Sequence, residues 1–160
     1  MRRVQMLLRD HQYIFPGDIE RQLDCSKPYE HPLIVEAIST GFFKHRTSVG
    51  NAHQAELVSS LPDEYPDELE LPGCMVAAAA TCVYASLREW ESGYHASIKY
   101  SATSYANVFD EHMEILGTIR KDKPHNYHQI MSRLLKLVRN GKSQSHDTSV
   151  SNTLRLIKFS

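Results

Sequence analysis

The chain has 160 residues, of which 41% are hydrophobic and 23% are charged, and its formal net charge is −1. This composition is typical of one globular domain and excludes a chain that is disordered throughout. No run of about 18 apolar residues is present, so neither a membrane-spanning helix nor a membrane partner is predicted. The apolar stretch at residues 4–8 is too short for the core of a secretory signal.

Cysteine usage indicates the compartment. The three cysteines, Cys25, Cys74 and Cys82, are odd in number and show no Cys-x-x-Cys spacing. The sequence also lacks an Asn-x-Ser/Thr sequon, so it favours a reducing, intracellular compartment and leaves cytoplasm and nucleus as alternatives. We expect Cys74 and Cys82 to be small buried side chains on a long helix.

The first part of the chain predicts short helices. Residues 4–8 can begin one, and a further helical turn is expected at residues 19–23. A proline at the first helical position, followed by apolar residues at helical spacing, predicts a buried helix over residues 32–43. A weaker helix is predicted over residues 51–60.

Residues 61–70 predict an exposed loop. They contain two prolines and five acidic side chains, which disfavour a regular buried element. A solvated loop is the default interpretation, and a site for a cation or a basic partner is the alternative. The order of the acids excludes a regular EF-hand calcium site.

An alanine-rich segment predicts the central helix of the fold, over residues 72–91. Apolar and small residues recur on one stripe at helical spacing: Met75, Ala78, Ala79, Cys82, Val83, Ser86, Leu87 and Trp90. The opposite side also carries little charge. We therefore expect this helix to be enclosed by three others, at residues 32–43, 102–119 and 124–140.

The remaining elements complete an all-α fold. At most one short extended segment is expected near residues 97–100. Ser101 is a suitable N-cap for the helix at residues 102–119, and a proline opens the helix at residues 124–140. The prediction is an irregular bundle of about five helices over residues 1–141, followed by a polar, flexible tail at residues 142–160.

Several sequence blocks resemble a known family. The blocks are Val4–Asp10 with Tyr13–Pro16, His31–Ile34 leading to Phe42–Phe43, Leu71–Pro72 with the alanine run, Leu87–Trp90 with Gly93, and Ser101, Tyr105 and Phe109–His112. In this order they resemble a fungal, chiefly basidiomycete, family known as domain of unknown function 6532. The resemblance spans about residues 4–117. It implies a helical fold and a fungal source, and it assigns no activity, cofactor or site residue.

Candidate chemical groups each have an ordinary structural interpretation. His125 and His128 are spaced like two metal ligands, but no third ligand is visible, so an exposed helix start is favoured. His112 lies on an apolar stripe, where a buried, hydrogen-bonded histidine is favoured over a catalytic base. Trp90 is expected to close the core, although with nearby tyrosines it can instead line a ligand groove or a protein-binding surface. No catalytic residue, cofactor or metal is predicted.

Charge is distributed unevenly along the chain. Residues 1–117 carry nine Lys and Arg against seventeen Asp and Glu, whereas residues 118–160 carry nine against two. A basic segment at residues 118–142 can track phosphates, can present a solvated face, or can pack on the acidic body. Its candidate partner-binding residues are Arg120, Lys121, Lys123, Arg133, Lys136, Arg139 and Lys142.

The leading functional hypothesis is a non-enzymatic helical interaction module that binds a protein partner or associates with itself. The first alternative is a protein that binds nucleic acid through residues 118–142, although a sequence pI near 6.7 is far below that of a dedicated binder. A small hydrolase or transferase is the second alternative, and the sequence shows no nucleophile motif for it.

Overall fold

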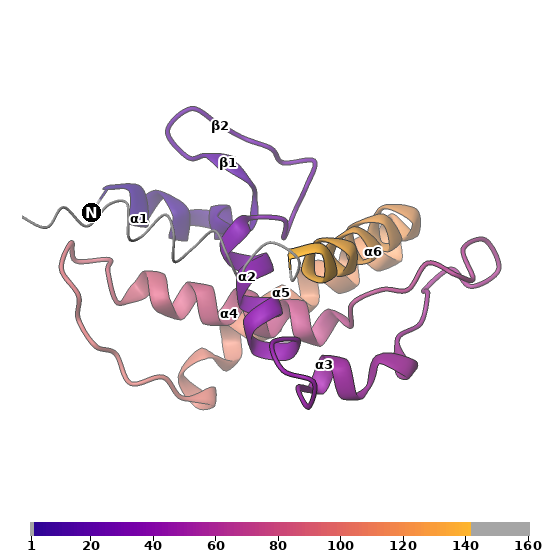
Figure 1. Cartoon of the computed structure of the whole chain (residues 1–160). Coiled ribbons are helices and arrows are strands. Elements are labelled where there is room, and N and C mark those ends of the chain that lie inside the picture. Colours follow the sequence, from indigo (N-terminus) through magenta and orange to yellow (C-terminus); the bar gives the residue numbers. More distant parts are fainter. Residues whose placement is uncertain (1, 142–160) are drawn as a thin grey trace, which may run out of the picture.

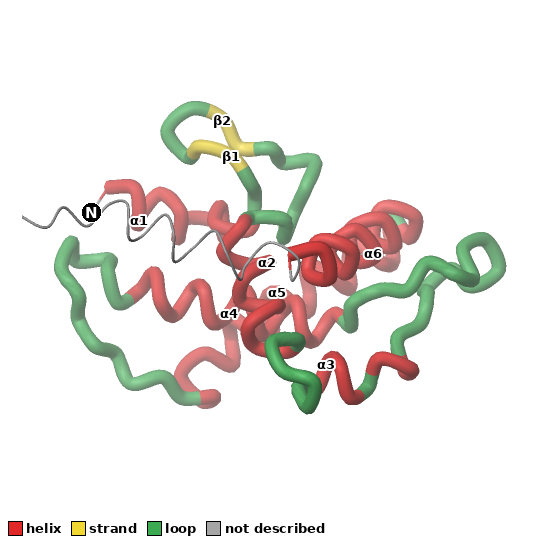
Figure 2. Tube along the Cα trace, viewed as in Figure 1, coloured by secondary structure: helices red, strands yellow, loops and turns green. Residues whose placement is uncertain are grey.

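The computed structural model describes residues 2–141, so the predicted tail at residues 142–160 lies outside the described residues. The described part is mostly helical, as predicted, with one very small sheet (Figures 1 and 2). Its elements are α1 (Arg2–Leu8), η1 (Arg9–Ile14), β1 (Gly17–Asp18), β2 (Gln22–Leu23), α2 (Pro32–Phe42), α3 (Val49–Ala52), η2 (Gln54–Glu56), α4 (Gly73–Arg88), α5 (Ala102–Asp122) and α6 (Pro124–Gly141).

The alanine-rich helix α4 is central, since it packs against α1, α2 and α5. The helix at residues 124–140 was also predicted to enclose α4, and this was wrong in part. Helix α6 packs mainly on α2 and α5, whereas α1 packs beside α4. Small side chains at Ala77 and Ala80 are fully buried and allow these helices to approach closely. Two long loops flank the helices on opposite sides of the view (Figure 2).

The buried face of α4 coincides only in part with the apolar stripe predicted from the sequence. Cys74 and Cys82 are exposed, and so is Cys25, so the expectation of buried thiols was wrong. Trp90 lies beyond the end of α4 and is 51% exposed, so it does not close the core. The reason is that α2 and α5 cover two sides of α4, which moves the centre of burial to the alanines and to Val76 and Thr81.

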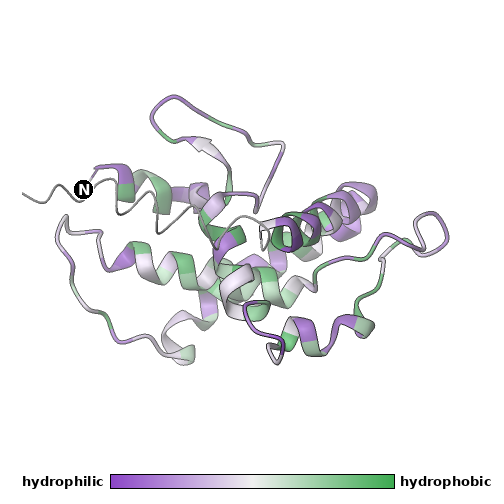
Figure 3. Cartoon of the chain, in the orientation of Figure 1, coloured by the Kyte–Doolittle hydropathy of each residue, from purple (hydrophilic) through white to green (hydrophobic). Residues whose placement is uncertain are grey.

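Side chains cap the N-termini of α2 and α5. Proline opens α2, and Nδ1 of His31 accepts a hydrogen bond from the backbone N–H of Leu33. Ser101 caps α5 by accepting from the N–H of Ser104, as predicted. Helix α6 was predicted to within a residue, and its apolar and polar sides are distinct in Figure 3.

Two predicted short helices differ from the structure. Residues 19–21 form a turn and residues 22–23 form β2, which pairs antiparallel with β1 in a hairpin that stands out from the helices (Figure 1). The side chain of Asp18 accepts a hydrogen bond from the N–H of Glu20 and favours this turn over a helix. The helix predicted over residues 51–60 is reduced to α3 and η2. Residues 97–100 form a loop, which agrees with the expectation of at most one short extended segment there.

A pair of glycine substitutions tests the packing. Gly50 is buried, and a Cβ there would lie 2.5 Å from the Phe43 ring and 2.7 Å from the carbonyl oxygen of Phe42. We expect Gly50→Ala to lower the free energy of unfolding by about 1–3 kcal/mol. Gly117 on α5 has open space around it, so Gly117→Ala should raise stability by about 1 kcal/mol. Urea denaturation measures both changes, and an unchanged Gly50→Ala protein would contradict the packing.

Candidate functional site

A buried histidine joins the N-terminal segment to α5. His112 is fully buried, as expected, and both of its ring nitrogens are engaged. Nε2 lies 2.6 Å from the hydroxyl of Tyr13, and Nδ1 lies 3.0 Å from the hydroxyl of Tyr29. Burial, together with the nearby His11 ring, lowers the pKa of His112 to about 4. The ring is therefore neutral at physiological pH.

The same hydrogen bonds continue to the protein surface through His11. Nδ1 of His11 lies 3.4 Å from the Tyr13 hydroxyl, and its Nε2 lies 2.8 Å from a carboxylate oxygen of Glu111. The His11 side chain is 18% exposed and Glu111 is 52% exposed. His11, Tyr13, Tyr29 and His112 form what we term the His–Tyr network, and Glu111 is its solvent-facing end.

The backbone of this network is strained. Asp10, His11 and Tyr29 are the non-glycine residues with positive φ in the described chain, at 50°, 53° and 66°. A left-handed conformation costs roughly 1–2 kcal/mol for residues other than glycine. Such strain persists only where surrounding contacts maintain it, and it is common at functional sites. Two of the three residues belong to the His–Tyr network.

Neutral His11 and His112 give one consistent set of hydrogen-bond directions. Nε2–H of His11 donates to Glu111, and the Tyr13 hydroxyl donates to Nδ1 of His11. Nε2–H of His112 then donates to Tyr13, and the Tyr29 hydroxyl donates to Nδ1 of His112. In this arrangement each ring nitrogen and each tyrosine hydroxyl of the His–Tyr network has a partner.

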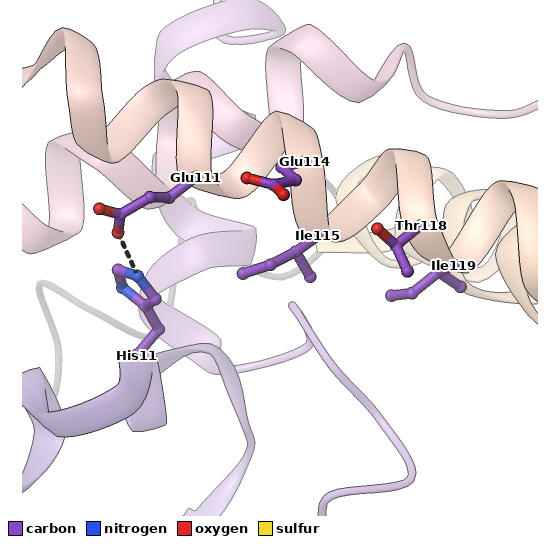
Figure 4. A pocket seen from close by; sticks show the side chains of 6 residues that line it. All are labelled: His11, Glu111, Glu114, Ile115, Thr118 and Ile119. Carbon is purple, nitrogen blue, oxygen red and sulfur yellow. Dashed lines mark hydrogen bonds and ion pairs between the residues drawn. The ribbon is translucent and has the colours of Figure 1, made fainter.

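A pocket of about 410 Å³ opens beside His11, which we term the His11 pocket. Figure 4 shows His11 facing Glu111 across its mouth, with the other lining side chains along α5. Ile115 and Ile119 supply apolar surface, and Thr118 and Glu114 supply polar groups. The pocket therefore combines a histidine–carboxylate pair with an apolar wall.

A second depression of about 410 Å³ lies between α2 and α4, and we term it the α2/α4 groove. Its lining is mainly apolar and includes Leu33 and Ala37 from α2, Val83 and Leu87 from α4, and Trp90. Leu33 and Trp90 are 43% and 51% exposed. Glu36 is the one charged residue that lines the groove. Large exposed apolar side chains around a depression are typical of a binding surface.

The acidic loop is fastened to α6 by a third cluster, which we term the His128 clamp (His128, Glu68 and Glu70). His128 is 1% exposed, with Nδ1 2.5 Å from Glu70 and Nε2 3.3 Å from Glu68. Tyr65 stacks on the imidazole at 4.7 Å. The prediction of an exposed histidine pair was thus wrong for His128, whereas His125 is exposed and pairs with Glu64. The loop itself is only partly exposed, because Glu70 is buried.

The predicted basic residues occupy different environments. Arg133 pairs with Glu30, and Lys136 lies 3.8 Å from Glu68, so these two pack on the acidic body. The others differ in their surroundings. Arg120 lies over the Tyr127 ring, and Lys121 and Lys123 are exposed near the end of α5. Nε of Arg139 is buried without a hydrogen-bond partner among residues 2–141, and Lys142 lies outside the described residues.

The comparison with known families is decisive for family membership. The model described as Domain of unknown function (DUF6532) matches residues 1–119. The chain belongs to this family. Within the DUF6532 match lie the whole His–Tyr network, the His11 pocket and the α2/α4 groove. No curated protein and no solved structure matches the chain.

Two further observations concern the described residues of this DUF6532 protein. Residues 2–141 contain no group of three His, Cys, Asp or Glu side chains arranged to hold a metal ion. Over the same range, each helix is either too short or too polar to cross a membrane. His11, Tyr13 and Tyr29 were absent from the predicted sites, because their partner His112 lies 83 to 101 positions away and no local pattern connects them.

Proposed function

We propose that the protein is a non-enzymatic helical interaction module, and that the α2/α4 groove docks an amphipathic helix of a protein partner. The observation that carries this proposal is an exposed tryptophan at one end of an apolar groove. Tryptophan in an apolar pocket is among the most frequent energetic centres of protein interfaces. A groove between two helices also suits a third helix with apolar residues at i, i+4 and i+7.

Charge supports a cationic partner. Glu36 lines the groove, no Lys or Arg lines it, and residues 1–117 carry an excess of acidic residues. A partner helix with Lys or Arg beside its apolar stripe therefore complements the groove, whereas a second copy of this acidic body would meet a like charge. A protein partner is accordingly favoured over self-association.

Catalysis at the His11–Glu111 pair has less support. The one hydroxyl in the His11 pocket belongs to Thr118, seven positions after Glu111 on α5. That spacing corresponds to roughly 10 Å along a helix, well beyond the reach of a base to its nucleophile. The three cysteines lie outside the pocket lining. Nucleic-acid binding also has less support, because Arg133 and Lys136 are engaged by carboxylates. A fungal source and an intracellular location stay predictions.

Trp90 provides the test, since it is the one tryptophan of the chain. We expect a helical peptide with leucines at i, i+4 and i+7 and flanking lysines to shift Trp90 fluorescence to shorter wavelength. Leu33→Ser should weaken binding about 10-fold, equal to about 1.4 kcal/mol, because Leu33 lines the groove. Val58→Ser is the matched control, since Val58 is 69% exposed and outside the groove.

Two control peptides test whether docking depends on the helical pattern and on the positive charge. A scrambled peptide of the same composition and a glutamate-flanked version should bind at least about 10-fold more weakly. Equal affinity for all three peptides, or equal loss in Leu33→Ser and Val58→Ser, would contradict docking in the groove. Sedimentation without peptide that shows a dimer lost in Leu33→Ser would replace the partner helix with a second copy of the chain.

A further inference from the structure

We propose that residues 153–160 of this chain dock as a short helix in the α2/α4 groove and compete there with the partner helix. The competition rests on the proposed function, whereas docking of the segment can be observed without any partner. The segment belongs to residues 142–160, which lie outside the described residues. The inference depends on its sequence pattern, on the length and charge of the groove, and on the packing of α6 against α2.

The sequence of the segment suits an amphipathic helix. Its apolar residues are Leu154, Leu156, Ile157 and Phe159, and its basic residues are Arg155 and Lys158. At about 100° per residue, a helix places the two basic side chains about 60° apart on one face and leaves an arc of about 220° to the apolar ones. A strand would place the two basic side chains on opposite faces. The helical conformation therefore separates charge from apolar surface.

The groove has the length and the charge for this occupant. Its lining on α2 runs from Leu33 to Thr40, which corresponds to roughly 10 Å along the helix axis. A helix over residues 153–160 would be about 12 Å long. Glu36 lies on the same wall and is exposed, and no Lys or Arg lines the groove. The groove therefore complements a helix that is apolar on one side and basic beside it.

The segment is connected closely enough to reach the groove. Helix α6 packs on α2 (Figure 1), and α2 forms one wall of the groove. A chain that leaves α6 therefore has to pass one helix, whose diameter is about 10–12 Å. Residues 142–152 form a connection of eleven residues, which can extend to about 36 Å. A connection this short also gives an effective concentration on the order of millimolar, so weak contacts suffice for docking.

Cys82 provides a direct test, because it is exposed and lines the groove. Ile157→Cys introduces a thiol on the apolar side of the segment. Under mild oxidation of the dilute full-length variant, we expect a disulfide within one chain between position 157 and Cys82. It should form at least about 5-fold more often than disulfides to Cys25 or Cys74, which are exposed but do not line the groove. Ser149→Cys, in the polar connection, should show no such preference, and mass spectrometry of the digested protein identifies each disulfide.

A second variant tests the competition. Full-length Leu156→Ser should bind the leucine and lysine peptide at least about 5-fold more tightly than the wild-type protein, because the competing segment is weakened. Without peptide, its Trp90 fluorescence should shift to longer wavelength, because the ring at the groove is less covered. Thr148→Ala, in the polar connection, is the matched control and should change neither measurement.

The outcomes separate this inference from the proposed function. Disulfides that form equally with all three cysteines, that favour Cys25 or Cys74, or that join two chains would overturn docking of the segment. A peptide that binds the wild-type and Leu156→Ser proteins equally would overturn the competition and leave the proposed function intact. If the disulfide to Cys82 forms and the peptide binds neither protein, the partner helix of the proposed function is wrong, and docking of residues 153–160 is supported.

Discussion

Lowering the pH from about 7.5 to about 4 is expected to lower the stability gap between the wild-type protein and His112→Gln by about 3 kcal/mol. We define this gap as the free energy of unfolding of the wild-type protein minus that of His112→Gln. The pKa of His112 is about 4 in the folded protein, below its ordinary value of 6.5. The unfolded chain therefore takes up a proton between these two values, whereas the folded protein does not. The stability that neutral His112 contributes is complete above about pH 6.5 and is lost as the pH falls towards 4.

Glutamine removes the titration but keeps a donor and an acceptor for the tyrosines. At neutral pH the variant should be less stable by about 1–3 kcal/mol, because the hydrogen bonds to Tyr13 and Tyr29 are impaired. Near pH 4 we expect His112→Gln to be as stable as the wild-type protein or more stable by up to about 2 kcal/mol, because only the wild-type protein loses stability through this titration. Urea denaturation at several pH values measures the gap. The exposed His45→Gln serves as control, and a gap that stays constant with pH would refute the assignment.

The second large effect is expected at the His128 clamp. His128→Ala should lower the free energy of unfolding by about 3–5 kcal/mol, because it leaves a cavity in place of the ring and removes the imidazole partner of the buried Glu70 carboxylate. Ser60 would remain as a hydrogen-bond donor to Glu70, and the stacking of Tyr65 would be lost. Residues 61–70 should then exchange their amide hydrogens much faster, since the clamp fastens this loop to α6.

Matched variants separate the clamp from ordinary surface pairing. His125→Ala, one turn earlier on α6, removes an exposed pair with Glu64 and should cost less than about 1 kcal/mol. Replacing both His128 and Glu70 by leucine should recover most of the loss, because a buried polar pair often adds little stability over a well-packed apolar pair. If His128→Ala costs no more than His125→Ala, the clamp does not stabilise the fold.

Much of the architecture was predictable from local sequence. Proline at the start of α2 and α6 and serine before α5 act within one turn of the helix, so these boundaries were placed correctly. The family was also identified from ordered sequence blocks and is confirmed by the match over residues 1–119. These signals are short-range or cumulative, and neither requires knowledge of which surfaces meet.

The candidate sites were less predictable because they depend on long-range contacts. Trp90 falls on the helical stripe of α4, but the helix ends at Arg88 and the ring lies at the groove. His128 was expected at the surface, and burial beneath the acidic loop reversed this. Three interpretations of the basic segment were left open, and the structure places Arg133 beside Glu30 and Lys136 beside Glu68.

Helix α6 lies outside the family match but belongs to the hydrophobic core. The match ends at residue 119, yet α6 follows it and fills the centre of the core. Its buried side chains include five large non-aromatic apolar ones: Ile130, Met131, Leu134, Leu135 and Val138. At about 2 kcal/mol each, they contribute about 10 kcal/mol, which is comparable with the whole stability of a domain. Residue 119 is therefore the end of a sequence match that falls inside helix α5, and the core extends beyond it into α6.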